Sequence, residues 1–243
     1  MSDVDQIAAV KATLEMVTAE NKELLEQFQE VREKLDTIEN MPPGIRSVQF
    51  RQLEQSGAFN FRNVDIRHFA SQTKKPLTPP QFVERTSRRL HNTESLIGKF
   101  LDHQDFEGGQ ELKSSLESLN SEIVNRNDQA AVIRFKKKVE ALRDTPLFKN
   151  YLAVRNEFLS SNTELKDEAD LMAAKETVAD GEMMAKDRQD EIKNLEEGME
   201  NGEVSPEEAQ EKLDAMEAQD QPDAAQPGAE AAADAPEEKA PTG

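Results

Sequence analysis

The sequence has no cysteine and no tryptophan, and only 5% of its residues are aromatic. The lack of cysteine excludes disulfide bonds, thiolate metal sites and thiol catalysis. With 36% hydrophobic and 33% charged residues in 243 positions, the chain can build only a lean core, which suits packed helices better than a large sheet. These absences predict a mainly α-helical protein.

Long apolar runs are also absent. No stretch approaches the roughly 20 apolar residues that a membrane-spanning helix needs, and the N-terminus has no apolar signal region. We therefore expect no membrane partner, and a location in the cytoplasm or at an intracellular site of viral assembly.

Charge is unevenly divided along the chain, whose formal net charge is −19. Residues 1–40 carry 4 basic and 10 acidic groups, residues 41–160 carry 19 and 14, and residues 161–243 carry 7 and 25. The three segments therefore have net charges of −6, +5 and −18. This sign pattern favours antiparallel or staggered association, or a tail that folds onto the basic middle.

Apolar residues return every seven positions between Ile7 and Ile38, which is the pattern of a coiled coil. The predicted seam consists of Ile7, Leu14, Asn21, Phe28 and Leu35 at the a positions and Val10, Val17, Leu24, Val31 and Ile38 at the d positions. A lone helix would leave this stripe in water, so residues 1–40 are predicted to be an oligomerisation helix that pairs with other copies. The alternative is an amphipathic helix packed on the body of its own chain.

The number of strands in that seam stays open. Asn21 at an a position favours a parallel dimer of fixed register, because its amide must meet a matching amide across the axis. The β-branched residues at the d positions favour three or four strands instead.

Residues 41–77 are predicted to be a linker or arm, because Met41-Pro42-Pro43-Gly44 must end the first helix. Alternation of apolar and polar residues permits a short β-hairpin here. The rival interpretation is a short helix over Ile45–Glu54 followed by an irregular arm. The apolar anchors of that arm would be Phe59, Phe61, Ile66 and Phe69. We expect them to cover the chain's own helices, and the alternative is that they fill a groove of a partner.

Residues 78–160 are predicted to form a small antiparallel bundle of four helices. Thr78 followed by two prolines starts the first helix, and Asp144-Thr145-Pro146 starts the last. Gly108-Gly109 marks the boundary between the first and second helices, and Asn127-Asp128 marks the boundary between the second and third. The apolar stripes of the later helices include Leu112, Leu116, Ile123, Ile133, Val139, Tyr151 and Phe158.

Residues 161–217 are predicted to be an acidic, mostly solvated helix, which Gly181 can interrupt, followed by a helical hairpin. The hairpin turn is indicated by Asn201-Gly202, and Ser205-Pro206-Glu207-Glu208 is a strong helix start with serine as the cap. Residues 218–243 have no apolar period and are predicted to be a disordered acidic tail.

Two basic clusters in the central segment are the candidate partner-binding residues. The first is Arg85, Arg88 and Arg89, which share one helix face, and the second is Arg134, Lys136, Lys137 and Lys138. Such faces can meet phosphates or a row of carboxylates. A net charge of +5 over 120 residues is small for a dedicated nucleic-acid binder, so acidic protein segments are the expected partners.

No catalytic, cofactor-binding or metal-binding residue is predicted. His91 and His103 lie about 18 Å apart along one expected helix, too far to share an ion. No pair of carboxylates stands in an apolar setting that would suit acid catalysis, and Gly108-Gly109 lacks the rest of a phosphate-binding fingerprint. We expect a protein that is not an enzyme.

These features together predict a non-enzymatic oligomeric assembly or adaptor protein. Its first helix would join several copies into an oligomer, and its central helices would dock a protein partner. Its acidic tail would keep the assembly in solution. In composition and layout the chain resembles capsid scaffolding proteins, which are acidic, helical and free of cysteine and end in a disordered tail. The alternative is a nucleic-acid-binding protein whose acidic tail competes for the two basic clusters and so inhibits binding.

Overall fold

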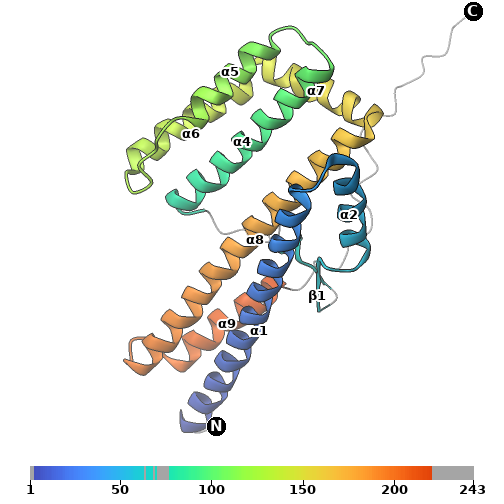
Figure 1. Cartoon of the computed structure of the whole chain (residues 1–243). Coiled ribbons are helices and arrows are strands. Elements are labelled where there is room, and N and C mark those ends of the chain that lie inside the picture. The colour runs from blue at the N-terminus through green and yellow to red at the C-terminus, as the bar shows by residue number, and fades with distance from the viewer. Residues whose placement is uncertain (1–2, 63, 68, 70–76, 221–243) are drawn as a thin grey trace, which may run out of the picture.

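The computed structural model describes residues 3–62, 64–67, 69 and 77–220, and these form helices with one small hairpin (Figure 1). The elements are α1 (Asp3–Glu39), α2 (Pro43–Gln55), β1 (Asn60–Phe61), β2 (Val64–Asp65), α4 (Pro79–His103), α5 (Gly109–Asn120), α6 (Gln129–Asp144), α7 (Pro146–Ser161), α8 (Thr163–Glu200) and α9 (Pro206–Asp220). The mainly α-helical class is confirmed. Nearly all of the predicted acidic tail, from residue 221 on, lies outside the described residues.

The ends of several helices are set by local capping groups. The backbone N–H of Thr78 donates to Gln81 Oε1 at 2.8 Å in the capping box of α4. Before α9, the N–H of Glu208 donates to Ser205 Oγ at 3.2 Å, and that of Ser205 donates to Glu208 Oε2 at 3.1 Å. Gly202, at a φ of +71°, lies in the turn after α8 and has the left-handed conformation that glycine adopts without strain. These helix boundaries match the prediction.

The seven-residue stripe of α1 is buried inside this chain. Its residues from Val10 to Ile38 are between 0 and 6% exposed, while Ile7 is 40% exposed. Helix α8 lies antiparallel beside α1, and α9 covers the N-terminal half of α1 (Figure 1). The structure therefore matches the alternative, a helix packed on its own chain. The side chains of the predicted seam are covered by α8, α9 and α2 of the same chain, so pairing between copies through this stripe stays a prediction.

The stripe contributes to two hydrophobic clusters along the α1–α8 pair. Near the N-terminus, Val10, Leu14 and Val17 pack on residues of α8 and α9. The α8 and α9 residues of that cluster are Ile192, Leu195, Ala209, Leu213 and Met216. Farther along, the α1 residues pack on α8, α2 and the hairpin. This second cluster includes Leu24, Phe28, Val31, Leu35, Ile38, Phe50, Leu53, Phe59, Ile66, Leu171, Ala174, Val178 and Ala185.

Helix α8 differs from the solvated helix that was predicted for this segment. It continues without a break through Gly181, and one side of it is buried against α1. Gly181 allows a close approach, because an added Cβ would lie 2.5 Å from Phe28 Cε1 and closer still to Cζ. Phe28 itself is fully buried. Small residues thus alternate with larger apolar ones, such as Leu171 and Val178, on this face of α8.

The arm contains parts of both predicted structures. The rival interpretation correctly placed a helix over Ile45–Glu54, and α2 begins two residues earlier, at Pro43. The hairpin is also present, but only as two-residue strands in which Asn60 pairs with Asp65 and Phe61 with Val64. Phe59 and Ile66 are buried on the chain's own helices, and Phe61 and Phe69 pack partly against the same cluster, as expected.

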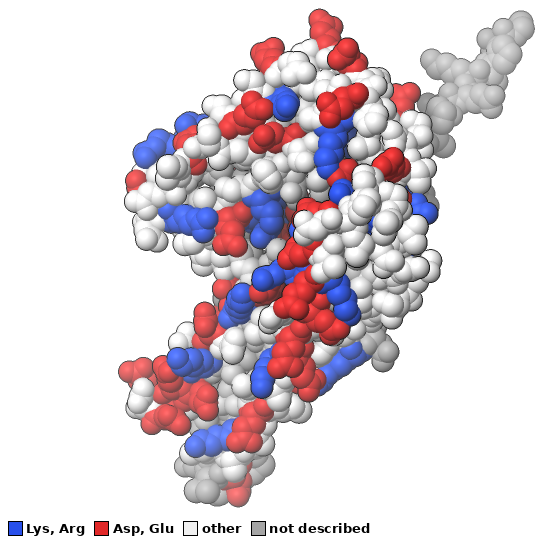
Figure 2. All heavy atoms as spheres, viewed as in Figure 1, with Lys and Arg blue, Asp and Glu red and all other residues white. Residues whose placement is uncertain are grey.

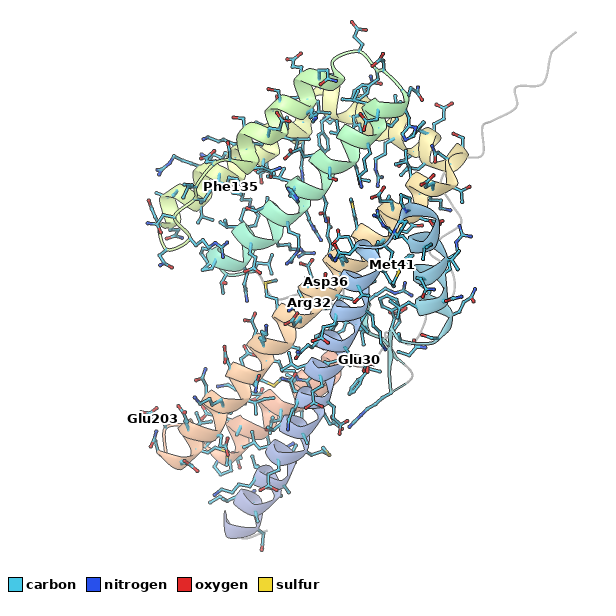
Figure 3. All side chains as sticks on the ribbon, in the orientation of Figure 1. Glu30, Arg32, Asp36, Met41, Phe135 and Glu203 are labelled. Atoms are coloured by element: carbon cyan, nitrogen blue, oxygen red, sulfur yellow. The ribbon has the colours of Figure 1, made fainter. Side chains whose placement is uncertain are left out.

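Helices α4 to α7 enclose a third cluster, and we call them the four-helix module. Phe135 points into its interior (Figure 3), where it lies among Val83, Leu90, Ile97, Leu112, Leu116, Val132, Val139, Phe148 and Tyr151. Burial raises the pKa of Tyr151 to about 12, despite the opposing effect of Arg155. Ile123 and Ile133, which were predicted to be in the apolar stripes, are 97% and 47% exposed instead.

Replacing Gly181 by alanine should destabilise the protein, because the new methyl group would overlap the fixed ring of Phe28. We expect a loss of about 1–3 kcal/mol in the free energy of unfolding, measured by urea denaturation. Gly44→Ala is the matched control, since an added Cβ there has no heavy atom within 4 Å among the described residues. If the two variants were equally stable, the close contact between α1 and α8 would be wrong.

Pairing of α1 within the chain can be tested by crosslinking, because the sequence has no cysteine of its own. Arg32 Nη1 lies 2.8 Å from Glu182 Oε2, so a double Arg32→Cys, Glu182→Cys variant places two thiols on facing helices. A short bismaleimide should link them within one chain and leave a species of 27.3 kDa. Covalent dimers that exceed those of the single-cysteine variants would show pairing between copies instead.

Candidate protein-binding surface

The first predicted basic cluster faces a carboxylate of its own chain. Arg85 Nε and Arg88 Nη2 each lie 2.7 Å from an oxygen of Asp180, and Arg89 Nη2 lies 3.2 Å from the same carboxylate. Asp180 is only 2% exposed. Three arginines of α4 therefore converge on one buried aspartate of α8, and their charge is used inside the molecule.

This cluster belongs to a longer polar contact between α4 and α8. Toward the C-terminus of α4, Asn92 donates to Glu176 Oε1 at 2.7 Å, and Lys99 pairs with Glu168. At its N-terminus, Gln81 donates to Asp187. Figure 2 shows basic and acidic side chains meeting where the module joins the long α1–α8 pair, beside a hollow on one flank of the molecule. Polar side chains thus join the four-helix module to α8.

The second predicted cluster stays on the surface. The side chains of Arg134, Lys136 and Lys138 are 66%, 57% and 54% exposed, and Lys137 is also exposed. Arg134 and Lys136 each lie 3.8 Å from a carboxylate oxygen, and Lys136 Nζ also lies 6.0 Å from the centroid of the Phe82 ring. Within the part of the chain that the structure describes, no ion pair is found for Lys137. Exposed pairs of this kind contribute about 0–1 kcal/mol, so these cations can readily change partners.

Two exposed isoleucines lie beside this cluster. Lys138 Nζ is 2.8 Å from Glu122 Oε2, which ties the loop that carries Ile123 to the side of α6. Ile133 precedes the cluster on α6 itself. We define the α6 surface as Ile123, Ile133, Arg134, Lys136, Lys137 and Lys138.

Sequence reasoning missed the exposure of Ile133 because it placed this residue in the buried stripe of α6 together with Val139. The buried residues are Val132, Phe135 and Val139, which repeat at i, i+3 and i+7 and turn Ile133 outward. That spacing was present in the sequence. Ile123 was missed for another reason, since α5 ends at Asn120 and leaves it in the loop.

Over residues 3–62, 64–67, 69 and 77–220, no group of three or more His, Asp or Glu side chains is placed to hold a metal ion. His91 and His103 are exposed, and His68 lies outside the described residues. No helix in the described residues combines the length and the apolar character that crossing a membrane requires.

Replacing Asp180 by asparagine should weaken the attachment of the four-helix module to α8, because three arginines lose their shared carboxylate. We expect a loss of about 2 kcal/mol, less than for a fully buried pair because the arginines are partly exposed. Urea unfolding can be followed by circular dichroism and by the fluorescence of Tyr151, the sole tyrosine, which reports on the module.

The matched control is Asp167→Asn on the same helix, because Asp167 pairs with Arg51, whose side chain is 54% exposed. It should cost less than about 1 kcal/mol. Equal effects of the two substitutions would contradict a special role for Asp180.

Comparison with protein-family models, with curated proteins and with solved structures found no match to this chain.

Proposed function

We propose that this chain is a non-enzymatic adaptor or assembly protein that docks an acidic segment of a partner protein on the α6 surface. One observation carries the proposal. Of the two basic clusters, the arginines of α4 are occupied by Asp180, whereas the cluster on α6 is exposed beside Ile123 and Ile133. Exposed cations with adjacent exposed apolar side chains are the two components that a protein interface needs.

The chemistry of the α6 surface indicates the kind of partner. Helix α6 carries five basic and two acidic residues, so its local charge is positive although the whole chain is acidic. At physiological salt, charges that lie more than about 8 Å away are largely screened. A partner at α6 is therefore affected mainly by the positive charge of this helix and little by the acidic remainder of the chain. A partner with carboxylates would be attracted to the lysines, and an apolar side chain between those carboxylates would cover an isoleucine.

The length of α6 suits a short helical or extended segment. Its 16 residues extend over about 24 Å, comparable with one side of a small interface. The helix is held firmly, because Val132, Phe135 and Val139 anchor it in the module. A partner would therefore meet a preformed surface and would lose little free energy to ordering of α6.

Self-association through the stripe of α1 is not part of this proposal. The residues predicted to form that seam are buried against α8, α9 and α2 in a single chain. Pairing of copies through the same side chains would require α1 to leave these contacts first.

Nucleic acid is the second candidate partner, because the excess of three positive charges on α6 could also meet phosphates. Glu122, Asp128 and Glu140 lie among the basic residues and would repel a phosphate backbone. An exposed isoleucine also adds little to a phosphate contact. We therefore favour the acidic protein segment.

The test uses the full chain and three labelled probes: an amphipathic peptide of glutamate and leucine, polyglutamate, and a short DNA duplex. We expect the glutamate–leucine peptide to bind more tightly than polyglutamate, because only the first can cover Ile133. A Lys136→Glu, Lys137→Glu variant should weaken peptide binding by about tenfold, measured by fluorescence anisotropy. Ile133→Ser should weaken binding of the amphipathic peptide but not of polyglutamate.

Lys149→Glu is the matched control, since Lys149 is equally exposed but lies on α7. It should leave peptide binding unchanged. Equal loss of binding in the control and the α6 variant would remove the α6 surface from the proposal. Binding of the DNA duplex with a steep salt dependence, together with no binding of either peptide, would favour the nucleic-acid candidate.

A further inference from the structure

An open groove lies between the C-terminal half of α1 and helix α2, and its volume is about 560 Å³. Ile38 of α1 and Leu53 of α2 line this groove and are only 5% and 8% exposed, so they form its floor. Met41, in the link between the two helices, lines it as well. The α1–α2 groove therefore has an apolar base.

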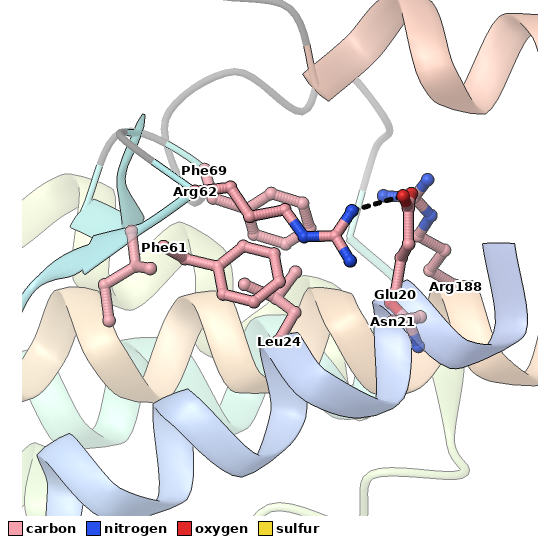
Figure 4. A pocket seen from close by; sticks show the side chains of 8 residues that line it. Glu20, Asn21, Leu24, Phe61, Arg62, Phe69 and Arg188 are labelled. Carbon is pink, nitrogen blue, oxygen red and sulfur yellow. Dashed lines mark hydrogen bonds and ion pairs between the residues drawn. The ribbon is translucent and has the colours of Figure 1, made fainter. Parts of the chain in front are cut away.

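The neighbouring part of α1 is closed by the arm. Phe61 and Phe69 line the same small pocket as Leu24, and Arg62 reaches across it to pair with Glu20 (Figure 4). The α1–α2 groove is lined only by residues between positions 30 and 56, so in the described part of the chain the hairpin does not cover it.

Two exposed apolar side chains of α2 extend the base of the groove. Ile45 and Val48 are each 53% exposed. They precede the groove residues Gln49 and Gln52 by four positions, so each lies one turn away on the same side of α2. A partner that enters the groove would cover them.

The charged residues that line the groove all belong to α1. Lys34 Nζ lies 2.6 Å from Glu30 Oε1, so these two charges balance. Glu33 accepts a hydrogen bond from Gln29, and among the described residues no cation pairs with it. Helix α1 as a whole has 4 basic and 10 acidic residues. The α1 wall of the groove is therefore acidic.

The two arginines of α2 do not cancel this acidic wall. Arg46 pairs with Glu168 and Arg51 pairs with Asp167, each at 2.7 Å, and both carboxylates belong to α8. Neither arginine lines the groove.

The outer side of α6 has a complementary shape and charge. Ala130, Ile133, Lys137 and Ala141 follow one another at intervals of three and four residues, so they form one ridge, and all four are exposed. The ridge has one large apolar side chain and one lysine between two alanines. The alanines would let the backbone of α6 come close to a groove between two other helices.

Helices α6 and α2 lie on opposite sides of the molecule, so one chain cannot bring the ridge into its own groove (Figure 1). Two copies can do so. Contact between like surfaces is disfavoured, because two grooves would oppose two acidic walls and two ridges would oppose two basic surfaces. Contact between the ridge of one copy and the groove of the next is favoured instead.

We propose that the acidic segment bound by the α6 surface belongs to a second copy of this chain and is its α1–α2 groove. Ile133 packs on the apolar base of the groove, and Lys137 pairs with Glu33. Each copy in such a pair keeps one free ridge or one free groove, so the contact is head-to-tail and can build rings or filaments. This inference rests on the proposed function, because it names the partner of the α6 surface.

The experiment measures the mass of the full chain by sedimentation velocity from about 1 μM to about 1 mM. The wild-type chain should grow beyond two copies as its concentration rises. A ridge variant, Ile133→Glu with Lys137→Glu, and a groove variant, Ile45→Glu with Val48→Glu, should each weaken self-association at least about tenfold. Both should remain folded by circular dichroism, because the altered side chains are exposed.

An equal mixture of the two variants tests whether unlike surfaces meet. The ridge variant keeps an intact groove, and the groove variant keeps an intact ridge. The mixture should therefore form dimers with one copy of each variant, at twice 27.3 kDa, that do not grow further. Contact between like surfaces would not give this result.

The matched control is Met16→Glu with Leu152→Glu. These side chains are 48% and 41% exposed, and they belong to neither the groove nor the ridge. The control should associate as the wild-type chain does. Equal loss of association in the control and in the ridge and groove variants would overturn the inference.

Failure of this inference can be told apart from failure of the proposed function. If the wild-type chain stays a single copy throughout but binds the glutamate–leucine peptide, the partner is another protein and only the inference is wrong. If neither the peptide nor a second copy binds, both are wrong. If the ridge variant associates as strongly as the wild type, or the mixture forms no dimers, the contact between α6 and the groove is refuted.

Discussion

The close antiparallel contact between α1 and α8 is the constraint on which the other parts of the structure depend. It is possible because α8 presents small residues, Ala174, Gly181 and Ala185, to the large side chains of α1. The opposite face of α8 carries Glu176 and Asp180, which meet the arginines of α4. One long helix therefore joins an apolar contact on one side to a polar contact on the other, and a break at Gly181 would separate them.

The ends of the helices could be predicted from the sequence because the groups that set them act over a few residues. Ser205 and Glu208 satisfy each other's backbone N–H groups, and Gly202 takes the left-handed turn before them. Neither depends on the rest of the fold. The same reasoning holds for Thr78 before α4. Local chemistry thus gave reliable helix boundaries over most of the described chain.

Long-range partners could not be predicted in this way. A seven-residue stripe requires a covering surface, but its spacing is the same whether that surface belongs to another copy or to this chain. Asn21 illustrates the point, since its amide donates to Ala185 rather than to a matching asparagine. The face of α8 that meets α1 also repeats every three or four residues, but alanine and glycine interrupt its large apolar side chains, and for this reason the stripe was not recognised. The carboxylate that faces Arg88 is likewise 92 positions away.

The two basic clusters show how the same residue types acquire different roles from their place in the fold. If α4 and α6 were isolated helices, Arg88 and Lys137 would both be exposed to solvent. In the structure α4 lies against α8, whereas α6 lies on the outer side of the module (Figure 1). The arginines therefore meet the acidic face of α8 and hold the module to it. The lysines of α6 do not face α8, and Lys136 and Lys138 lie beside Glu140 and Glu122 at the surface, where more than half of each side chain stays exposed.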